Sequence, residues 1–252
     1  MRKVKIAIEE IYKSFGEKHV LQGVDLDIFE GEVMYIIGKS GSGKSVTMKH
    51  ISALLKPDKG RVLIDNVDIF QLDDEELGRQ RKKLGVLFQM AALFDSMTVF
   101  ENVAFSLRRF TKKSEEEIED LVMQKLKLVG LRGVEQLNPS SLSMGMQKRV
   151  GLARAIAIEP EIVLYDEPTT GVDPILASAV DDLIKTLNEE LKVTSVVISH
   201  DMKSTFRTAD RVAMLYDGKF ILTGEPDEFK YSDNEIVRQF VDGKAHGPIP
   251  IL

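Results

Sequence analysis

Gly38-Lys39-Ser40-Gly41-Ser42-Gly43-Lys44-Ser45 fits the pattern G-x-x-x-x-G-K-[ST], and the fold is inferred outward from this stretch. Its glycines let the backbone curl so that N–H groups point inward and cradle phosphate oxygens. Lys44 adds a positive charge for the terminal phosphates, Ser45 offers a hydroxyl to Mg²⁺, and a helix beginning here adds its positive dipole end. The stretch therefore predicts a nucleotide phosphate loop with contacts from Gly38, Lys39, Ser40, Gly41, Ser42, Gly43, Lys44, Ser45 and the following Val46.

The residues on either side of the loop have the patterns of a strand and a helix. Residues 33–37 form a buried-strand run that leads into the loop, and residues 46–55 form a helical pattern that leaves it. The alternative is a flexible Gly/Ser turn without a ligand. The order of strand, loop and helix favours phosphate binding.

Other apolar patterns predict two kinds of sheet. Residues 4–8 and 20–28 alternate, which predicts an antiparallel β layer. Residues 162–165 and 194–199 are nearly continuous apolar runs, typical of parallel strands buried on both faces. Between them, Asp173 as N-cap with a proline after it predicts a helix to about residue 191. The alternation of strands and helices predicts a doubly wound α/β fold.

A helical segment interrupts this alternation after a short strand at residues 84–88. Ser114 and Glu117 form a capping box, and Gly130 closes the helix that follows. A second helix is predicted over residues 143–157. We therefore expect a helical insert at residues 90–159.

Polar residues follow the predicted buried strands at the edge where ligands bind in such sheets. They are Gln89, the pair Asp166 and Glu167, and His200. Each alone has a plain alternative as a solvated or structural residue, but together with the phosphate loop they predict a catalytic site.

The residue types suggest a role for each group. Asp166 is predicted to hold Mg²⁺ opposite Ser45, and Glu167 to polarise an attacking water. Gln89 is expected to orient that water or touch the metal, and His200 to donate to the γ-phosphate. With Lys44 on the phosphates, these catalytic candidates predict ATP hydrolysis by in-line attack of water.

Composition limits the class of protein. The 252 residues carry a formal net charge of -6, so we expect no nucleic-acid partner. Cysteine is absent, which excludes disulfides, thiolate metal sites and a cysteine nucleophile. No apolar run reaches the roughly 20 residues of a spanning helix, and no export signal is recognisable, so we expect a cytosolic location.

Further motifs occur in a characteristic order along the chain. After the phosphate loop come Gln89, Leu142-Ser143-Met144-Gly145-Met146, residues 162–167, Thr170-Gly171-Val172-Asp173 and His200. By these motifs the chain resembles ABC transporter ATPases over essentially its full length. The resemblance implies a P-loop NTPase fold with ATP and Mg²⁺ as cofactors. It divides the chain into a RecA-like core with an antiparallel β layer at 1–89 and 160–242, a helical subdomain at 90–159 and a tail at 243–252.

The resemblance also implies contacts that the residue patterns alone do not. Phe15 is similar to the family's adenine-stacking aromatic, with core packing as the alternative. Ser143 and Gly145 are implied to contact the ATP of a partner subunit in a head-to-tail homodimer, although Ser143 also serves as a helix cap. Asp173 is implied to lie at the dimer contact as well. Met144 stands where the family usually has glycine, which puts the geometry near the phosphate in doubt.

A narrower resemblance concerns residues 85–105, Met146 in place of the usual glutamine, and the tail at 247–250. These are similar to the ATPase of Mla or MCE-associated transporters. The implied partners are an integral membrane permease, an MCE-domain lipid-binding protein and a small STAS-domain subunit. The implied location is the cytoplasmic face of the inner membrane, and the implied function is to power phospholipid transport between the inner and outer membranes.

Two apolar segments are candidates for contacts with other chains. Residues 91–94 can dock a helix of the permease or pack inside the helical insert. The tail, with Ile249, Ile251 and Leu252, is predicted to bind another subunit. The competing functions are an ABC ATPase for amino acids, lipoproteins or another solute, and a non-transport ABC ATPase acting on a nucleic-acid or ribosomal machine.

Overall fold

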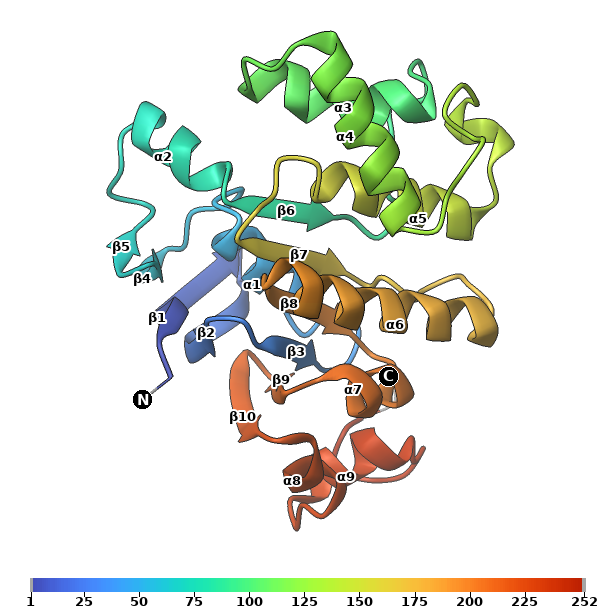
Figure 1. Ribbon diagram of the computed structural model, residues 1–252. Helices are drawn as coiled ribbons and strands as arrows, with labels where there is room; N and C mark the ends of the chain where they lie inside the picture. Colours follow the sequence, from blue (N-terminus) through green and yellow to red (C-terminus); the bar gives the residue numbers. More distant parts are fainter. Residues whose placement is uncertain (1, 251–252) are drawn as a thin grey trace.

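The protein, described over residues 2–250 by a computed structural model, contains a six-stranded and a four-stranded sheet (Figure 1). The larger sheet has the spatial order β10 (Lys219–Gly224), β9 (Arg211–Tyr216), β3 (Val33–Ile37), β8 (Thr194–Ser199), β7 (Ile162–Asp166) and β6 (Leu84–Leu87). Strands β9 to β6 pair in parallel, whereas β10 runs antiparallel to β9. The predicted parallel α/β sheet is confirmed.

The smaller sheet is antiparallel, with the order β2 (Lys18–Phe29), β1 (Val4–Phe15), β4 (Lys59–Ile64) and β5 (Val67–Asp68). This confirms the expected antiparallel layer. Strands β1 and β2 extend beyond the predicted residues 4–8 and 20–28. The sequence did not predict the extension of β1, because the second half of this strand is mostly polar or exposed and lacks an alternating apolar pattern. Pairing with β2 continues there through several register shifts.

The parallel sheet separates two hydrophobic cores. The strand-side core lies between this sheet, the antiparallel sheet and α1 (Lys44–Ile51). The helix-side core lies on the other face, under the helices that follow β6 and β7. Strand β3 serves both, since Tyr35 points into the helix-side core and Met34 and Ile36 into the strand-side core.

Three helices between β6 and β7 form a layer beyond the β6 end of the sheet, at the top of Figure 1. They are α3 (Val99–Phe110), α4 (Glu115–Leu128) and α5 (Met144–Ala155). The 3-10 turn η1 (Pro139–Ser141) lies between α4 and α5. The capping box of Ser114 and Glu117 is confirmed, and Ser143 caps α5 by accepting from Met146 N at 3.3 Å.

The C-terminal half adds α6 (Pro174–Leu191), α7 (Met202–Thr208), α8 (Pro226–Lys230) and α9 (Glu235–Asp242). Asp173 caps α6 through the N–H groups of Ile175 and Leu176, as predicted. No helix within residues 2–250 is both long and apolar enough to cross a bilayer.

Helices α7, α8 and α9 were not predicted from the sequence, and two helices nearer the N-terminus also differ from the expectation. Helix α1 begins at Lys44 and ends at Ile51, earlier than residues 46–55, and Ala53 beyond it has a positive φ of 55°. Helix α2 (Asp74–Arg81) was not predicted. It buries none of its residues and so has no apolar periodicity, although its capping box of Asp73 and Glu76 was a usable signal.

A charged cluster joins the two sheets. Lys5 on β1 contacts Asp65 at 2.8 Å and also Glu161, which precedes β7. Lys83, which precedes β6, contacts the other oxygen of Asp65 at 2.7 Å. Burial opposes ionisation of Asp65, but hydrogen bonds from both lysines outweigh it and hold the pKa of this carboxyl below its usual value.

The tail folds back onto its own chain over the described residues. The side chain of Gln239 on α9 pairs with the backbone of Ile249, accepting from its N–H at 2.6 Å and donating to its C=O at 3.1 Å. Ile249 packs against the helix-side core. Gln239 therefore supplies the backbone partners of Ile249 within the chain, and the contact of the tail with another subunit stays a prediction; Ile251 and Leu252 lie outside the described residues.

Candidate nucleotide-binding site

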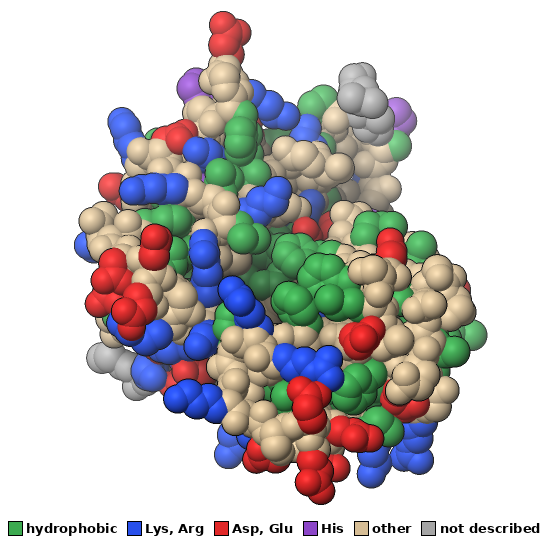
Figure 2. All heavy atoms as spheres, turned by 90° about the horizontal axis from the view of Figure 1, so that it is seen from above, with side chains coloured by type: hydrophobic (Ala, Val, Ile, Leu, Met, Phe, Trp, Pro, Cys, Tyr) green, Lys and Arg blue, Asp and Glu red, His purple; other side chains and the backbone are tan. Residues whose placement is uncertain are grey.

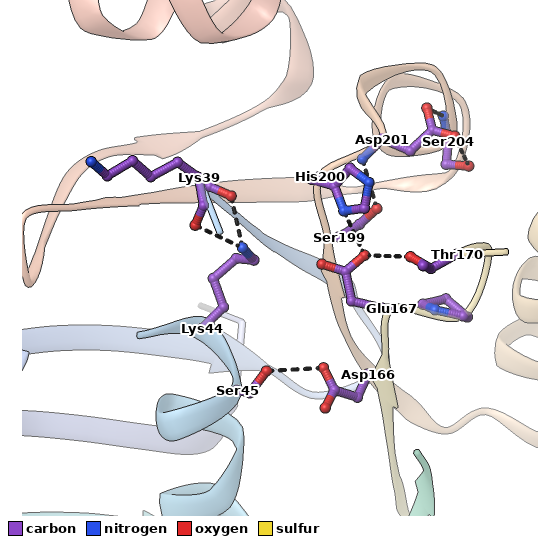
Figure 3. Close-up of polar contacts among 12 residues, drawn as sticks. Lys39, Lys44, Ser45, Asp166, Glu167, Thr170, Ser199, His200, Asp201 and Ser204 are labelled. Carbon is purple, nitrogen blue, oxygen red and sulfur yellow. Dashed lines mark hydrogen bonds and ion pairs between the residues drawn. The ribbon is translucent and has the colours of Figure 1, made fainter. Parts of the chain in front are cut away.

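The phosphate loop connects β3 to α1, as predicted. The Lys44 ammonium lies inside the curl of the loop and donates to the carbonyl oxygens of Gly38 at 2.7 Å and Lys39 at 3.1 Å (Figure 3). Burial lowers the pKa of Lys44, and the charges of Glu167 and Asp166 oppose this shift. A glycine is required at 38, since a Cβ there would lie 2.3 Å from the Leu215 carbonyl oxygen.

A cavity of about 710 Å³ opens beside the loop and contains most of the predicted site residues. Its lining comprises Phe15, Lys18, Val20, Lys39, Ser40, Gly41, Gly43, Lys44, Ser45, Val46, Gln89, Glu167, His200 and Phe240. Strand-end residues that are far apart in the sequence thus meet the phosphate loop at one place. The side chain of Lys39 extends away from Lys44 (Figure 3).

Asp166, the last residue of β7, faces Ser45 at the start of α1, with Oδ1 accepting from Oγ at 3.2 Å (Figure 3). Burial raises the pKa of Asp166, and the hydrogen bond from Ser45 opposes the shift. Within residues 2–250 no group of three or more His, Cys, Asp or Glu forms a protein-only metal cage. One carboxylate and one hydroxyl beside a phosphate loop suit Mg²⁺, which takes few protein ligands and keeps water and phosphate oxygens.

Glu167 points away from Asp166, toward His200 and Thr170 (Figure 3). Its Oε2 lies 2.7 Å from His200 Nδ1 and accepts from Thr170 Oγ1 at 2.8 Å. From the sequence, we expected the side chains of Asp166 and Glu167 to point apart because side chains alternate along a strand, but β7 ends at Asp166. The actual cause is the backbone of Glu167, which has a φ of 50°.

Ser143 and Gly145 at the start of α5 do not line this cavity. Ser143 is exposed, and the exposed Met144 lies against the segment after Glu167: a Cβ on Gly171 would be 3.0 Å from its sulfur. The bulky side chain that replaces the usual glycine therefore packs on the chain's own loop.

Sequence reasoning missed Phe240, which α9 places in the cavity wall, and also Lys18 and Val20 of β2. The apolar spacing of Ile236, Val237, Phe240 and Val241 indicates an amphipathic helix. Nothing in that spacing places the helix beside the phosphate loop.

Residues 21–170 match the ABC transporter family, and the chain belongs to this family of ATPases. Its relatives include the intermembrane phospholipid transport system ATP-binding protein MlaF of Haemophilus influenzae, 40% identical over 97% of this chain and 92% of that protein. TRIGALACTOSYLDIACYLGLYCEROL 3 of the Arabidopsis thaliana chloroplast is 46% identical over 98% of this chain and 76% of that protein. The probable ribonucleotide transport ATP-binding protein mkl of Mycobacterium leprae is 42% identical over 98% and 71%, respectively.

Solved structures agree with the sequence comparison. The dimeric post-hydrolysis structure of the ATP-binding cassette MJ0796 bound to ADP and Pi superposes with a TM-score of 0.81 and 36% identity. The superposition covers 88% of this chain and 98% of the MJ0796 chain. The chain therefore has the fold of an ABC cassette and binds and hydrolyses ATP.

Proposed function

We propose that this chain powers phospholipid transport between membranes through a separate permease. Support for the cargo comes from MlaF, which is similar over nearly the full length of both chains. Support for the energy source comes from one structural observation: the phosphate loop, Gln89, Glu167 and His200 line a single cavity.

In the proposed chemistry, Lys44 and the loop N–H groups hold the terminal phosphates. Ser45 and Asp166, with Gln89 beside them, hold Mg²⁺, which when bound supplies positive charge against the phosphate oxygens. Glu167 polarises the attacking water. His200, which directly follows the neighbouring strand β8, holds the Glu167 carboxylate in place.

The proposed working unit is a head-to-tail homodimer. Ser143 is exposed at the N-terminus of α5 and lies outside the chain's own cavity, which supports a contact with the ATP of a second copy. Gly145 is buried within the first turn of α5, so its proposed contact would come from the backbone at the start of the helix. The dimeric structures of similar cassettes support this arrangement.

A groove of about 520 Å³ supports docking of a membrane subunit. It lies between β6, α2 and α3 and is lined by aromatic and aliphatic side chains that include Phe88, Ala92, Phe94, Phe105 and Phe110. Figure 2 shows hydrophobic side chains gathered in a hollow flanked by Lys and Arg side chains on this upper face. Ala91 is buried whereas Phe94 is 41% exposed, so the segment 91–94 both packs inward and reaches the groove.

The proposed partners are an integral membrane permease, an MCE-domain lipid-binding protein and a STAS-domain subunit, with the chain at the cytoplasmic face of the inner membrane. The test is to purify the tagged chain from its own membranes and identify the bound chains. The complex is then reconstituted in vesicles to measure ATP-dependent transfer of labelled phospholipid.

Recovery of a permease and an MCE protein with lipid transfer supports the proposal. Transfer of a ribonucleotide, amino acid or lipoprotein instead would reassign the cargo, and recovery with ribosomes would reassign the class of protein. Glu167→Gln in the same vesicles controls for transfer that does not need hydrolysis.

A further inference from the structure

Lys148 on α5 is a buried lysine whose partners are all backbone carbonyls. Its exposed fraction is 3%, and its Nζ donates to the carbonyl oxygens of Glu167 at 3.3 Å, Pro168 at 2.8 Å and Thr170 at 2.5 Å. An ammonium has three protons to donate. The three carbonyls of one turn therefore match the full donor capacity of this side chain.

A lysine at this position is costly to the fold. Burial lowers the pKa of Lys148, which shows that desolvation of the ammonium is incompletely offset, while the charge of Glu167 opposes the shift. An apolar side chain of similar length would fill the space without that penalty. The residue is therefore best explained by the hydrogen bonds that it gives to the turn.

The turn needs such support because its first residue has a strained backbone. Glu167 has a φ of 50°, in the left-handed region that disfavours residues other than glycine. A strained conformation persists only where its surroundings fix it. Thr170 and His200 fix the carboxylate of Glu167, and Lys148 fixes the backbone that carries it.

We propose that Lys148 is a positioning residue for ATP hydrolysis: by binding three carbonyls of the turn at 167–170, it aims the Glu167 carboxylate into the nucleotide cavity. This inference rests on the proposed role of Glu167. Lys148 does not line the cavity itself, so it acts through Glu167 and not by contact with nucleotide.

The same helix touches the turn at a second point, where Met144 packs beside Gly171. Helix α5 and the turn therefore form one packed unit. Of these two contacts, the one made by Lys148 carries the charge-assisted hydrogen bonds, so it holds the backbone of Glu167 more firmly than the packing of Met144.

The test compares Lys148→Met with wild type in the purified full chain. Removing the three donors should lower kcat for ATP hydrolysis roughly 10- to 100-fold, since a misplacement of about 1 Å has effects of this size. KM and the affinity for ATP should stay within about twofold, because the phosphate loop is intact. Lys148→Gln, which keeps two donors, should recover part of the lost kcat. If Lys148→Met fails to fold, Lys148→Gln takes its place in the test and should lower kcat while KM stays within about twofold.

The matched control is Lys125→Met, because Lys125 is 2% exposed on α4 but pairs with Glu159, which precedes β7, whereas the turn follows the other end of that strand. It should lower thermal stability without lowering kcat. Equal losses of kcat in Lys125→Met and Lys148→Met, or a loss of ATP affinity as large as that of kcat, would overturn the inference.

A double-mutant cycle separates this inference from the role of Glu167 itself. Adding Lys148→Met to Glu167→Gln should leave the residual single-turnover rate unchanged, because residues acting through one another are not additive. A further fall by the same factor overturns the positioning role. An inactive Glu167→Gln beside a fully active Lys148→Met overturns only this inference, whereas an active Glu167→Gln overturns the proposed role of Glu167 as well.

Discussion

The Nδ1 atom of His200 lies 2.7 Å from Oε2 of Glu167, and Thr170 donates to that same oxygen. A carboxylate only accepts, so Nδ1 carries the proton in this contact. With this proton on Nδ1, the neutral form of the ring presents Nε2 as an acceptor. His200 therefore orients Glu167 in this arrangement, and the predicted donation to a γ-phosphate requires a second proton on the ring.

The first prediction concerns Glu167→Gln. The amide keeps the shape of the side chain but cannot act as a base, so ATP turnover should fall about 10²- to 10⁴-fold. ATP binding, measured with a fluorescent analogue, should persist. Turnover at a near wild-type rate would refute the proposed role of this residue.

A second prediction addresses the metal. Asp166→Asn and Ser45→Ala should each raise the Mg²⁺ concentration for half-maximal turnover by at least about tenfold, because each removes a contact of the predicted oxygen site. Binding of ATP without Mg²⁺ should change little. The control is Asp182→Asn, which alters an exposed carboxylate on α6 and should need the same Mg²⁺ concentration for half-maximal turnover as wild type.

The aromatic side chains that line the cavity yield a third prediction. Phe15 is 51% exposed and lines the cavity, so core packing does not account for it. Phe15→Ala should weaken ATP affinity by about 1–3 kcal/mol, the usual loss of one base stack, and Phe15→Tyr should retain it. Phe240→Ala should weaken affinity by a smaller amount, since Phe240 also packs against the helix-side core. An unchanged affinity of Phe15→Ala for ATP would refute the proposed stacking of Phe15 on the base.

Docking of the permease can be tested at Phe94. A carboxylate in the apolar groove should abolish co-purification with the permease, so Phe94→Asp should leave ATP turnover of the free chain intact but lose assembly. Tyr231→Asp, which alters an 81% exposed residue after α8, should assemble normally. Normal assembly of both variants would exclude the groove as the docking site.

The charged cluster between the sheets predicts a pH dependence of stability. Because the folded pKa of Asp65 is lowered, its contribution is complete above the unfolded value of about 3.9 and is lost as the pH falls through the folded pKa. Asp65→Asn should lower the free energy of unfolding by about 1–2 kcal/mol at pH 7. The two unfolding free energies should converge at low pH.

Asn suits this comparison because position 65 has a φ of 51°, which Asn tolerates. Glu75→Gln removes an exposed ion pair with Arg79 and should have little effect. A difference in unfolding free energy between Asp65→Asn and wild type that stays constant from pH 7 to pH 2 would contradict the lowered pKa of Asp65.

Much of the site followed from local sequence signals. The phosphate loop, the caps at Ser114 and Asp173 and the two buried strands β7 and β8 were identified because each is specified by neighbouring residues. The convergence of Gln89, Glu167 and His200 followed from the rule for parallel strand ends. Phe240 and Lys148 could not be placed in this way, because their contacts depend on how distant helices pack.

Asp166 and Glu167 are adjacent in sequence, yet their partners belong to opposite sides of the parallel sheet. Asp166 contacts α1, which packs into the strand-side core, and Glu167 is supported from α5, which packs into the helix-side core. Substitutions in the strand-side core therefore reach the cation contact first, whereas substitutions in the helix-side core reach the group that polarises water first.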